Sequence, residues 1–410
     1  MLRIRRFAAS LLALAVLAAN SGHAQAPASP AGPPILAAPG PGAVATDPSR
    51  RLGGVRTWGY QLQQGDPETI AKSPYDLVVV DYSRTGEDGE RFTPEEVRRM
   101  QTRPDGGRRL VLAYLSIGEA ETYRYYWNED WAEPLKVLAE GDIVEDKADP
   151  EKAGKGGAAA KRGGTRTRTL GVPRLSAPVW LGRENFAWAG NFLVRYWEKG
   201  WQDIIFGSKD AYLERIIAAG FDGVYLDRVD AFYGVTDERA SGKTDMVAFV
   251  TALARRARDL KPGFAIVPQN GEELLLEPAY LATIDGIAKE DLLYGNPSEG
   301  QPNNPATVSN SVTWLSPALR HGLPVLVVEY LLEKETAERL RADITEKGFI
   351  AYFGTRSLDR LILPEDLKPA RTAPSVGAPA AKAAPPTAGK AQQSRRTAPA
   401  ARNAKAGKQR

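Results

Sequence analysis

The stretch GFDGVYLDRVDAF, residues 220–232, decides the fold prediction. Its apolar run of four residues ends at Asp227, and two further charged residues follow closely. Apolar runs without polar interruption are typical of strands that are buried on both faces of a parallel sheet. Because side chains alternate along a strand, Gly223, Tyr225 and Asp227 share one side. The stretch therefore predicts a buried strand that presents a carboxylate at its C-terminal end.

Similar apolar runs recur along the chain, and many are separated by amphipathic helical patterns. The predicted strands lie at residues 55–63, 77–82, 109–119, 192–197, 223–227, 264–270, 286–291 and 324–331. Eight strands that alternate with helices over roughly 250 residues fit a (β/α)8 TIM-type barrel of the α/β class. A ninth run at 348–354 either closes this barrel or adds a small extra strand. The rival fold, an open doubly wound sheet, has no support from a G-x-G-x-x-G motif after the first strand.

The ends of the chain and one internal segment differ in composition from the predicted barrel. Residues 1–26 combine three arginines, a short apolar run and a final A-x-A, so they predict a cleaved secretory signal peptide and a secreted or periplasmic protein. The apolar run is too short for a membrane span. We expect an Ala/Pro-rich linker at 27–52, the barrel at 53–361 with a low-complexity insertion at about 141–174, and a disordered basic Ala/Pro/Lys tail at 362–410.

The scarcity of histidine and cysteine restricts the chemistry. The chain has no cysteine, and of its two histidines only His321 lies outside the predicted signal peptide. Disulfides, thiolate catalysis and multi-histidine metal sites are therefore excluded, and neither a metal nor a cofactor is predicted. General acid and base catalysis must come from carboxylates, tyrosine or lysine.

The positive charge is concentrated in the low-complexity segments. The formal net charge is +4, but residues 367–410 alone carry ten Lys/Arg and no acid. Residues 151–174 add seven basic residues against one acid, so the remaining body is acidic. An acidic body argues against a nucleic-acid partner and favours a neutral or cationic substrate. The basic tail is expected to be solvated or to contact an anionic cell envelope.

Polar residues end most of the predicted strands. The carboxyl ends of barrel strands form the active site, so these side chains are expected to converge. Gly286, Ala288 and Glu290 share a side of their strand, which places Glu290 at the same rim as Asp227. A single strand-end Asp is also a good helix N-cap, but several carboxylates at one rim indicate a ligand or a catalytic pair. Two opposed carboxyl groups are the arrangement used for glycoside hydrolysis.

Tyrosine and tryptophan are also frequent near the predicted strand ends. The segment ETYRYYW at residues 121–127 is too dense and polar for a core and better suits the wall of a substrate cleft. Aromatic rings there could stack on sugar rings, and phenol hydroxyls could bond sugar hydroxyls.

Five ordered segments resemble a known family. WGYQLQ, DLVVVDYS, LAYLSIGEAETYRYYW, GFDGVYLDRVDAF and IAKEDLLYG are similar to glycoside hydrolase family 114, the endo-α-1,4-polygalactosaminidases. The resemblance covers most of residues 53–361 and implies a (β/α)8 barrel. It also implies that Asp227 and Glu290 are the catalytic pair and that the substrate is an amino-sugar polymer. The ammonium groups of such a polymer suit an acidic body.

The resemblance and the strand-end pattern together give a set of expected roles. Either carboxyl group can be the acid at this point. In the favoured assignment Asp227 is the ionised carboxylate, held so by Arg228, and Glu290 is the acid, with its pKa raised by Asp291 and Glu329. Expected substrate-binding residues are Asp81, Tyr114, Glu119, Arg228, Asp230, Asn270, Tyr294 and Glu329.

Two other functions fit the same residues. A barrel can keep a polysaccharide site and lose catalysis, which would make the protein a binding protein of the cell envelope. Alternatively, Asp81, Asp227, Asp230 and Glu290 could hold Ca²⁺ or Mg²⁺ in a metal-dependent hydrolase. The retained carboxylates argue against the first function, and the lack of a ligand-spaced loop argues against the second.

Overall fold

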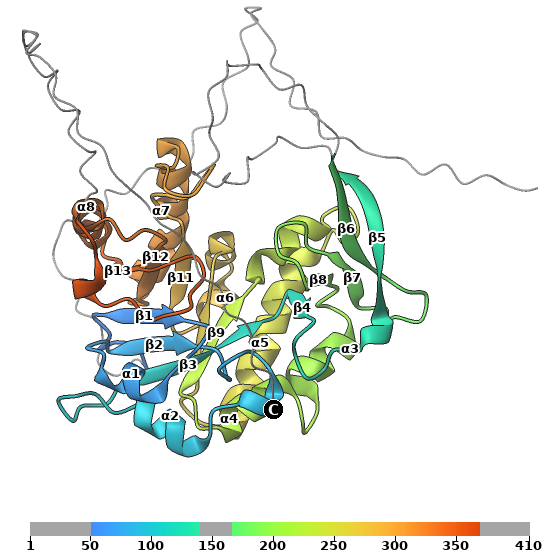
Figure 1. Ribbon diagram of the computed structural model, residues 1–410, viewed down its shortest axis with the longest axis horizontal. Helices are drawn as coiled ribbons and strands as arrows, with labels where there is room; N and C mark the ends of the chain where they lie inside the picture. The colour runs from blue at the N-terminus through green and yellow to red at the C-terminus, as the bar shows by residue number, and fades with distance from the viewer. Residues whose placement is uncertain (1–50, 140–165, 370–410) are drawn as a thin grey trace, which may run out of the picture.

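The computed structural model describes residues 51–139 and 166–369. The predicted signal peptide, most of the linker, much of the insertion and nearly all of the tail lie outside these residues. In Figure 1 the described part forms one body of helices and strands, from which the long pair of strands β5 and β6 projects. Across the described ranges, no helix is long and apolar enough to cross a membrane.

Eight of the described strands run parallel, in two sheets. The first sheet has the order β1-β2-β3-β9-β10 and the second the order β11-β12-β13. Their bounds are β1 Trp58–Gln61, β2 Leu77–Val80, β3 Leu110–Ser116, β9 Gly223–Asp227, β10 Ala265–Pro268, β11 Ile287–Glu290, β12 Val325–Glu329 and β13 Ile350–Phe353. Nearly every residue of these strands is buried, as expected for parallel sheets with both faces covered.

A few contacts join the two sheets, in place of a continuous ladder of hydrogen bonds. An isolated parallel bridge links Gln269 to Ala288 between β10 and β11. At the other side the indole of Trp58 on β1 donates to the carbonyl of Ile350 on β13, at 2.9 Å. The structure thus shows an α/β fold with two parallel sheets that meet at both edges, and not one continuous closed sheet.

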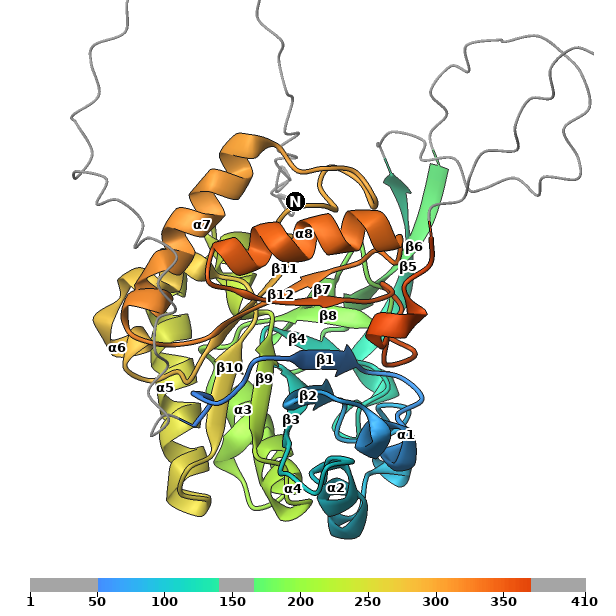
Figure 2. The ribbon, with the colours of Figure 1, turned by 90° about the vertical axis from the view of Figure 1, so that its left-hand side faces the viewer.

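Helices cover the outer side of the strands. Figure 2 shows α7 and α8 on the side of β11 to β13, and α1 and α2 near β2 and β3. The helices are α1 Pro67–Lys72, α2 Pro94–Met100, α3 Lys199–Gln202, α4 Tyr212–Ala218, α5 Gly242–Leu260, α6 Pro278–Leu281, α7 Pro305–Arg320 and α8 Lys334–Glu346. Their starts follow local rules: Thr93 and Glu96 form a reciprocal capping box at α2, and Asn304 caps α7 before Pro305.

A smaller antiparallel region follows β3. The strands β4 Glu119–Glu121, β8 Asn191–Val194 and β7 Leu181–Glu184 form one three-stranded sheet, and β5 Ala132–Ala139 pairs with β6 Arg166–Pro173. The prediction that 192–197 is a barrel strand was therefore wrong, because β8 pairs with β4 and β7 instead. The run at 348–354 supplies the eighth parallel strand, β13. Residues 166–173, expected within an insertion loop, form β6, which pairs with β5 along its whole length in antiparallel register.

The core contains a guanidinium with no carboxylate among its hydrogen-bond partners. Arg109 lies directly before β3 and is fully buried. It donates to the carbonyls of Ile70 and Met100, both at 2.7 Å, to that of Tyr75 at 2.8 Å and to that of Ser73 at 2.5 Å. These carbonyls lie at or just beyond the ends of α1 and α2, where backbone acceptors have no partner within the helix. Arg109 therefore ties both helices to the start of β3.

We expect Arg109→Lys to lower the free energy of unfolding by about 3 kcal/mol, because a lysine ammonium cannot satisfy the planar fork of carbonyls. Urea titration followed by circular dichroism measures this loss. Arg98→Lys, at an exposed pair with Glu95, is the matched control and should leave the urea midpoint unchanged. Equal midpoints for the two variants would contradict the assigned role of Arg109.

Candidate active site

Asp227 and Glu290 end two strands that are separated by one strand. Asp227 is the last residue of β9 and Glu290 the last of β11, with β10 between them. The alternation predicted from the sequence holds, since Tyr225 and Ala288, two residues earlier on the same sides, are fully buried. Both carboxyl groups lie at the C-terminal ends of the parallel strands and are partly exposed.

One amide links the two carboxyl groups. Gln269, the first residue after β10, donates from Nε2 to Asp227 Oδ1 at 3.3 Å and also to Glu290 Oε2. Because both bonds start at one nitrogen, the two accepting oxygens lie no farther apart than two hydrogen-bond lengths, about 6 Å. Gln269 is itself buried, and its Oε1 lies 3.5 Å from the hydroxyl of Tyr60.

Asp227 accepts further hydrogen bonds from fixed groups. The Tyr114 hydroxyl on β3 donates to its Oδ2 at 2.6 Å, and the main-chain N–H of Arg228 donates to its Oδ1 at 2.7 Å. Burial, and then the charge of Glu290, raise the pKa of Asp227 to about 7, although the Tyr114 bond opposes the rise. The carboxyl group is therefore able to hold a proton near neutral pH.

Glu290 is surrounded in a comparable way. The Tyr330 hydroxyl, directly after β12, donates to its Oε1, and the Asn270 amide donates to its Oε2 at 3.3 Å. Burial raises the pKa of Glu290, the Tyr330 bond opposes the rise, and the charge of Asp291 adds to it. The guanidinium of Arg356 pairs with Asp291 through two bonds of 2.9 Å and lies over the Tyr330 ring.

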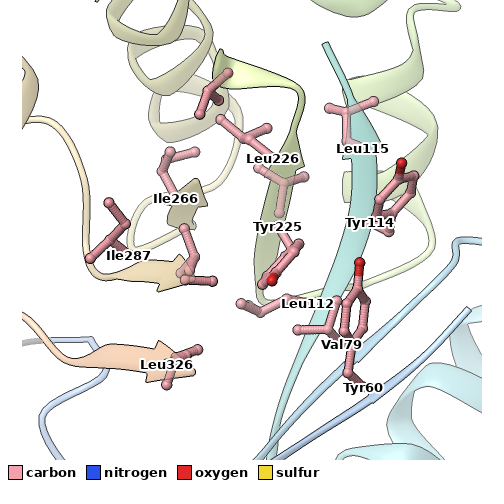
Figure 3. Close-up of a cluster of buried hydrophobic side chains, with 14 of the residues drawn as sticks. Tyr60, Val79, Leu112, Tyr114, Leu115, Tyr225, Leu226, Ile266, Ile287 and Leu326 are labelled. Carbon is pink, nitrogen blue, oxygen red and sulfur yellow. The ribbon is translucent and has the colours of Figure 1, made fainter. Parts of the chain in front are cut away.

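Aromatic rings pack beneath the two carboxyl groups. Trp58, Tyr60, Tyr225 and Tyr352 are almost completely buried, and the Tyr60 and Tyr225 ring centroids are 5.1 Å apart. Figure 3 shows Tyr60, Tyr114 and Tyr225 among aliphatic side chains of the neighbouring strands. This apolar base explains why burial is the largest cause of both raised pKa values.

The Arg228 side chain does not contact Asp227 as expected. Its Nε lies 3.0 Å from Glu119 Oε1, and its Nη1 lies 3.4 Å from Asp230 Oδ1. Arg228 has a left-handed backbone with φ of 62°, and its contact with Asp227 is made by its main-chain N–H. Glu119 is buried and also accepts from Asn185 at 2.6 Å. Arg228, Glu119 and Asp230 thus form a charged cluster next to the carboxyl pair.

Asp81 is held by protein donors. Its carboxylate accepts two bonds from Arg124, at 3.0 and 2.7 Å, and the fully buried Arg124 also pairs with Glu121 at 2.7 Å. The Tyr123 hydroxyl donates to Glu121. This arrangement favours a supporting role, in which Asp81 fixes the segment 121–124 beside Tyr114 rather than contacting a substrate.

Glu329 faces the segment that follows β11, and Tyr294 lies in that segment. Glu329 is fully buried and accepts from the main-chain N–H groups of Leu293 and Tyr294, at 2.8 and 3.1 Å. It fixes this segment, and Asp291 rather than Glu329 adds to the raised pKa of Glu290. The Tyr294 hydroxyl accepts from Arg339 at 2.9 Å, and its ring lines a groove of about 530 Å³ between α7 and α8.

The sequence analysis missed Gln269 and did not single out Tyr330 for the site. The alternation that located Asp227 would also have located Gln269, because Ala265, Val267 and Gln269 share one side of β10 and its continuation. Tyr330 could not be placed in this way without knowing which side of β12 faces Glu290. The prediction did include Asn270 and Tyr114, and both contact the carboxyl pair.

The described residues give no support to a metal site. Among them, no group of three or more histidine, aspartate or glutamate residues is arranged to hold a metal ion. Two of the four candidate ligands, Asp81 and Asp230, are instead paired with Arg124 and Arg228.

Comparison with known proteins gives one family match. The model of glycoside-hydrolase family GH114 matches residues 171–367. An uncharacterised protein of Deinococcus radiodurans is 35% identical over 366 residues, which cover 86% of this chain and 98% of that protein. An uncharacterised protein of Methanocaldococcus jannaschii is 32% identical over 321 residues, 74% of this chain and 77% of that protein.

One solved structure aligns with much of this chain. The glycoside hydrolase domain of PelA from Pseudomonas aeruginosa aligns with 75% of this chain and 97% of its own length. The TM-score is 0.48 and the sequence identity is 16%.

The raised pKa of Asp227 predicts a pH-dependent stability. Between the ordinary value of 3.8 and about 7, the folded protein binds the Asp227 proton more tightly than the unfolded chain does. The free energy of unfolding should therefore fall as the pH rises through this range, with a contribution from Asp227 of about 1 to 3 kcal/mol. In Asp227→Asn this part of the fall should be lost, so the variant should be more stable than wild type at pH 8.

Urea titrations at pH 4, 6 and 8 test the effect. Asp237→Asn changes an exposed carboxyl group beyond the same strand and serves as control. Parallel pH dependences for Asp227→Asn and wild type would refute the raised pKa.

Proposed function

Because the chain belongs to glycoside-hydrolase family GH114, we propose that it hydrolyses an α-1,4-linked galactosamine-containing polysaccharide with Asp227 and Glu290 as its catalytic pair. The observation that carries the proposal is the single Gln269 amide that bonds both carboxyl groups, at the ends of β9 and β11. Such a pair can supply one ionised and one protonated carboxyl group, which glycoside hydrolysis requires.

We assign Asp227 as the nucleophile. It accepts a main-chain N–H, a phenol hydroxyl and the shared amide, all of which stabilise its ionised form during attack on the anomeric carbon. We assign Glu290 as the acid that protonates the leaving oxygen and later as the base that activates water. Its raised pKa, to which burial and Asp291 contribute, suits an acid.

The proximity of the two groups favours retention of anomeric configuration. The accepting oxygens lie within about 6 Å, closer to the spacing of retaining enzymes than to that of inverting ones, which leave room for a water molecule. The reaction would then pass through a covalent glycosyl ester on Asp227, which Glu290 helps water to hydrolyse.

The surrounding charges support a cationic sugar. Asp230 keeps a partly exposed carboxylate beside the pair, and Glu119 and Asp291 add negative charge nearby. An ammonium group on the sugar would be attracted to this region. We propose further that the eight parallel strands act together as a (β/α)8 frame, supported by the contacts between β10 and β11 and between β13 and β1, and that the protein is exported through residues 1–26.

We expect Asp227→Asn and Glu290→Gln, made separately, each to lower kcat about a thousand-fold or more on the polymer that wild type cleaves. Reducing-end release from deacetylated and N-acetylated galactosamine polymers measures this loss and identifies the preferred polymer. Asp210→Asn, an exposed change remote from the pair, is the control. Activity that survives in both site variants would overturn the assigned pair. Binding of the polymer by wild type without hydrolysis would favour the alternative, a catalytically inactive binding protein.

The stereochemical outcome tests the roles within the pair. Proton NMR of the first products should show the anomeric configuration of the substrate. Added azide should rescue Asp227→Asn and Glu290→Gln to opposite anomers, because azide replaces the nucleophile in the first and water in the second. Inverted first products from wild type would contradict a covalent intermediate on Asp227.

A further inference from the structure

Lys289 lies beside the proposed acid but on the opposite side of β11. Its Nζ lies 3.3 Å from Asn270 Oδ1 and 3.3 Å from Glu272 Oε1. Glu272 is buried and also accepts from the Ser311 hydroxyl of α7 at 2.8 Å. The Lys289 side chain is 18% exposed, so the ammonium is held between β11, α7 and the 3₁₀ segment Glu272–Leu276.

The contacts of Asn270 determine how its amide is turned. Its side-chain oxygen faces two groups that can only donate, Lys289 Nζ and the main-chain N–H of Glu290, the latter at 3.2 Å. The amide nitrogen must then face Glu290 Oε2, which accepts from it at 3.3 Å. The opposite orientation would place donors against donors at Glu290 N–H and Lys289, and an amide oxygen against the carboxylate.

The backbone of Asn270 favours this position. Its φ is 60°, a left-handed conformation that asparagine tolerates better than most residues, and its N–H donates to the carbonyl of Ala288 at 2.9 Å. The amide is therefore fixed at its backbone and at both ends of its side chain. Donors on the oxygen also polarise the amide and strengthen donation from its nitrogen.

We propose that Lys289 is a positioning residue for Glu290, acting through the Asn270 amide, with Glu272 and Ser311 holding the ammonium in place. The proposal rests on the proposed function, in which Glu290 is the catalytic acid. Lys289 reaches Glu290 through the Asn270 amide, whose oxygen accepts from Lys289 and whose nitrogen donates to Glu290 Oε2. Its effect is to keep a polarised donor on the carboxylate, which stabilises the ionised form that Glu290 adopts after giving up its proton.

Other groups also face Glu290 and must be kept constant in a test. The titratable or charged groups come from β1 and β9 and from the segments that follow β11, β12 and β13. In that order they are Tyr60, Tyr225, Asp227, Asp291, Tyr330 and Arg356. The Lys289 ammonium is instead bonded to Asn270 and Glu272, so a change at Lys289 leaves the contacts of these six residues with Glu290 in place.

The test is a double-mutant cycle of Lys289→Met and Asn270→Gly. Methionine keeps the length of the side chain, and glycine keeps the positive φ while removing the amide. In Lys289→Met we expect the pKa of Glu290 to rise by about one unit and kcat to fall about ten-fold, with KM little changed. In the Asn270→Gly background, the same Lys289→Met change should have no further effect on the pKa of Glu290.

Carbon-13 NMR of the glutamate carboxyl groups, assigned with Glu290→Gln, measures the pKa without any substrate. Ser309→Ala is the matched control, because it removes an exposed hydroxyl from the same helix α7 and leaves the contacts of Lys289 and Glu272 in place. If Lys289→Met fails to fold, Lys289→Met with Glu272→Gln removes the buried unpaired carboxylate and allows the same comparison.

Each outcome is decisive. An equal pKa rise in both backgrounds would show a direct charge effect and overturn the role of Asn270, and no rise at all would overturn the role of Lys289. If no polymer is hydrolysed but the pKa of Glu290 moves as expected, the positioning contact stands and the proposed function fails. If hydrolysis is found and the pKa of Glu290 does not move, the proposed function stands and the positioning role of Lys289 fails.

Discussion

The Gln269 amide nitrogen is bonded to the carboxyl groups of both Asp227 and Glu290, and the contacts around the site depend on this arrangement. Two like charges so close together are unfavourable unless one group holds a proton or the surroundings stabilise both. The surroundings here are donors from several strands: Tyr114 from β3, Gln269 from the end of β10 and Tyr330 from the end of β12. Each donor works only if its strand is in register with its neighbours. The strand order and the chemistry therefore depend on each other.

The charged residues around the carboxyl pair form two clusters. Arg228, Glu119 and Asp230 form a cluster on the β9 side, and Arg356 with Asp291 forms another on the β11 side. Both guanidinium groups are engaged by carboxylates other than the catalytic pair. As a result, neither fully offsets the burial of Asp227 and Glu290, and both groups keep raised pKa values. A site with an arginine directly on either carboxylate would lose its capacity to hold a proton.

Much of this arrangement could be predicted from the sequence. The alternation in GVYLD and GIAKE located Asp227 and Glu290 correctly at strand ends, because a period of two needs only local information. Gln269 was within reach of the same rule. The direction of the Arg228 side chain could not be predicted by this rule, because Arg228 has a left-handed backbone and the alternation applies only to extended residues. Nothing in the sequence Asp-Arg-Val indicates this conformation. The strand β8 was misplaced for a different reason: an apolar run shows that a strand forms but not which strand it pairs with.

The segments with the weakest sequence signal also gave the least accurate boundaries. Residues 166–173 look like low-complexity sequence, yet they pair over eight positions with β5. Amino-acid composition describes a segment on average, whereas the formation of a strand depends on whether a partner strand is available to pair with it. The same distinction applies to Asp81 and Glu329, which were singled out as rim residues by position but are saturated by donors of the protein itself.

Arg109 has a consequence for experiments on the site. Its partners are carbonyl groups, which do not titrate, and burial lowers the pKa of the guanidinium only to about 10. The brace between α1, α2 and β3 therefore keeps the same charge state across the whole interval in which Asp227 exchanges its proton. A change of activity or stability with pH between about 4 and 8 therefore does not come from a change in the charge of this brace, which is electrostatically silent over that interval.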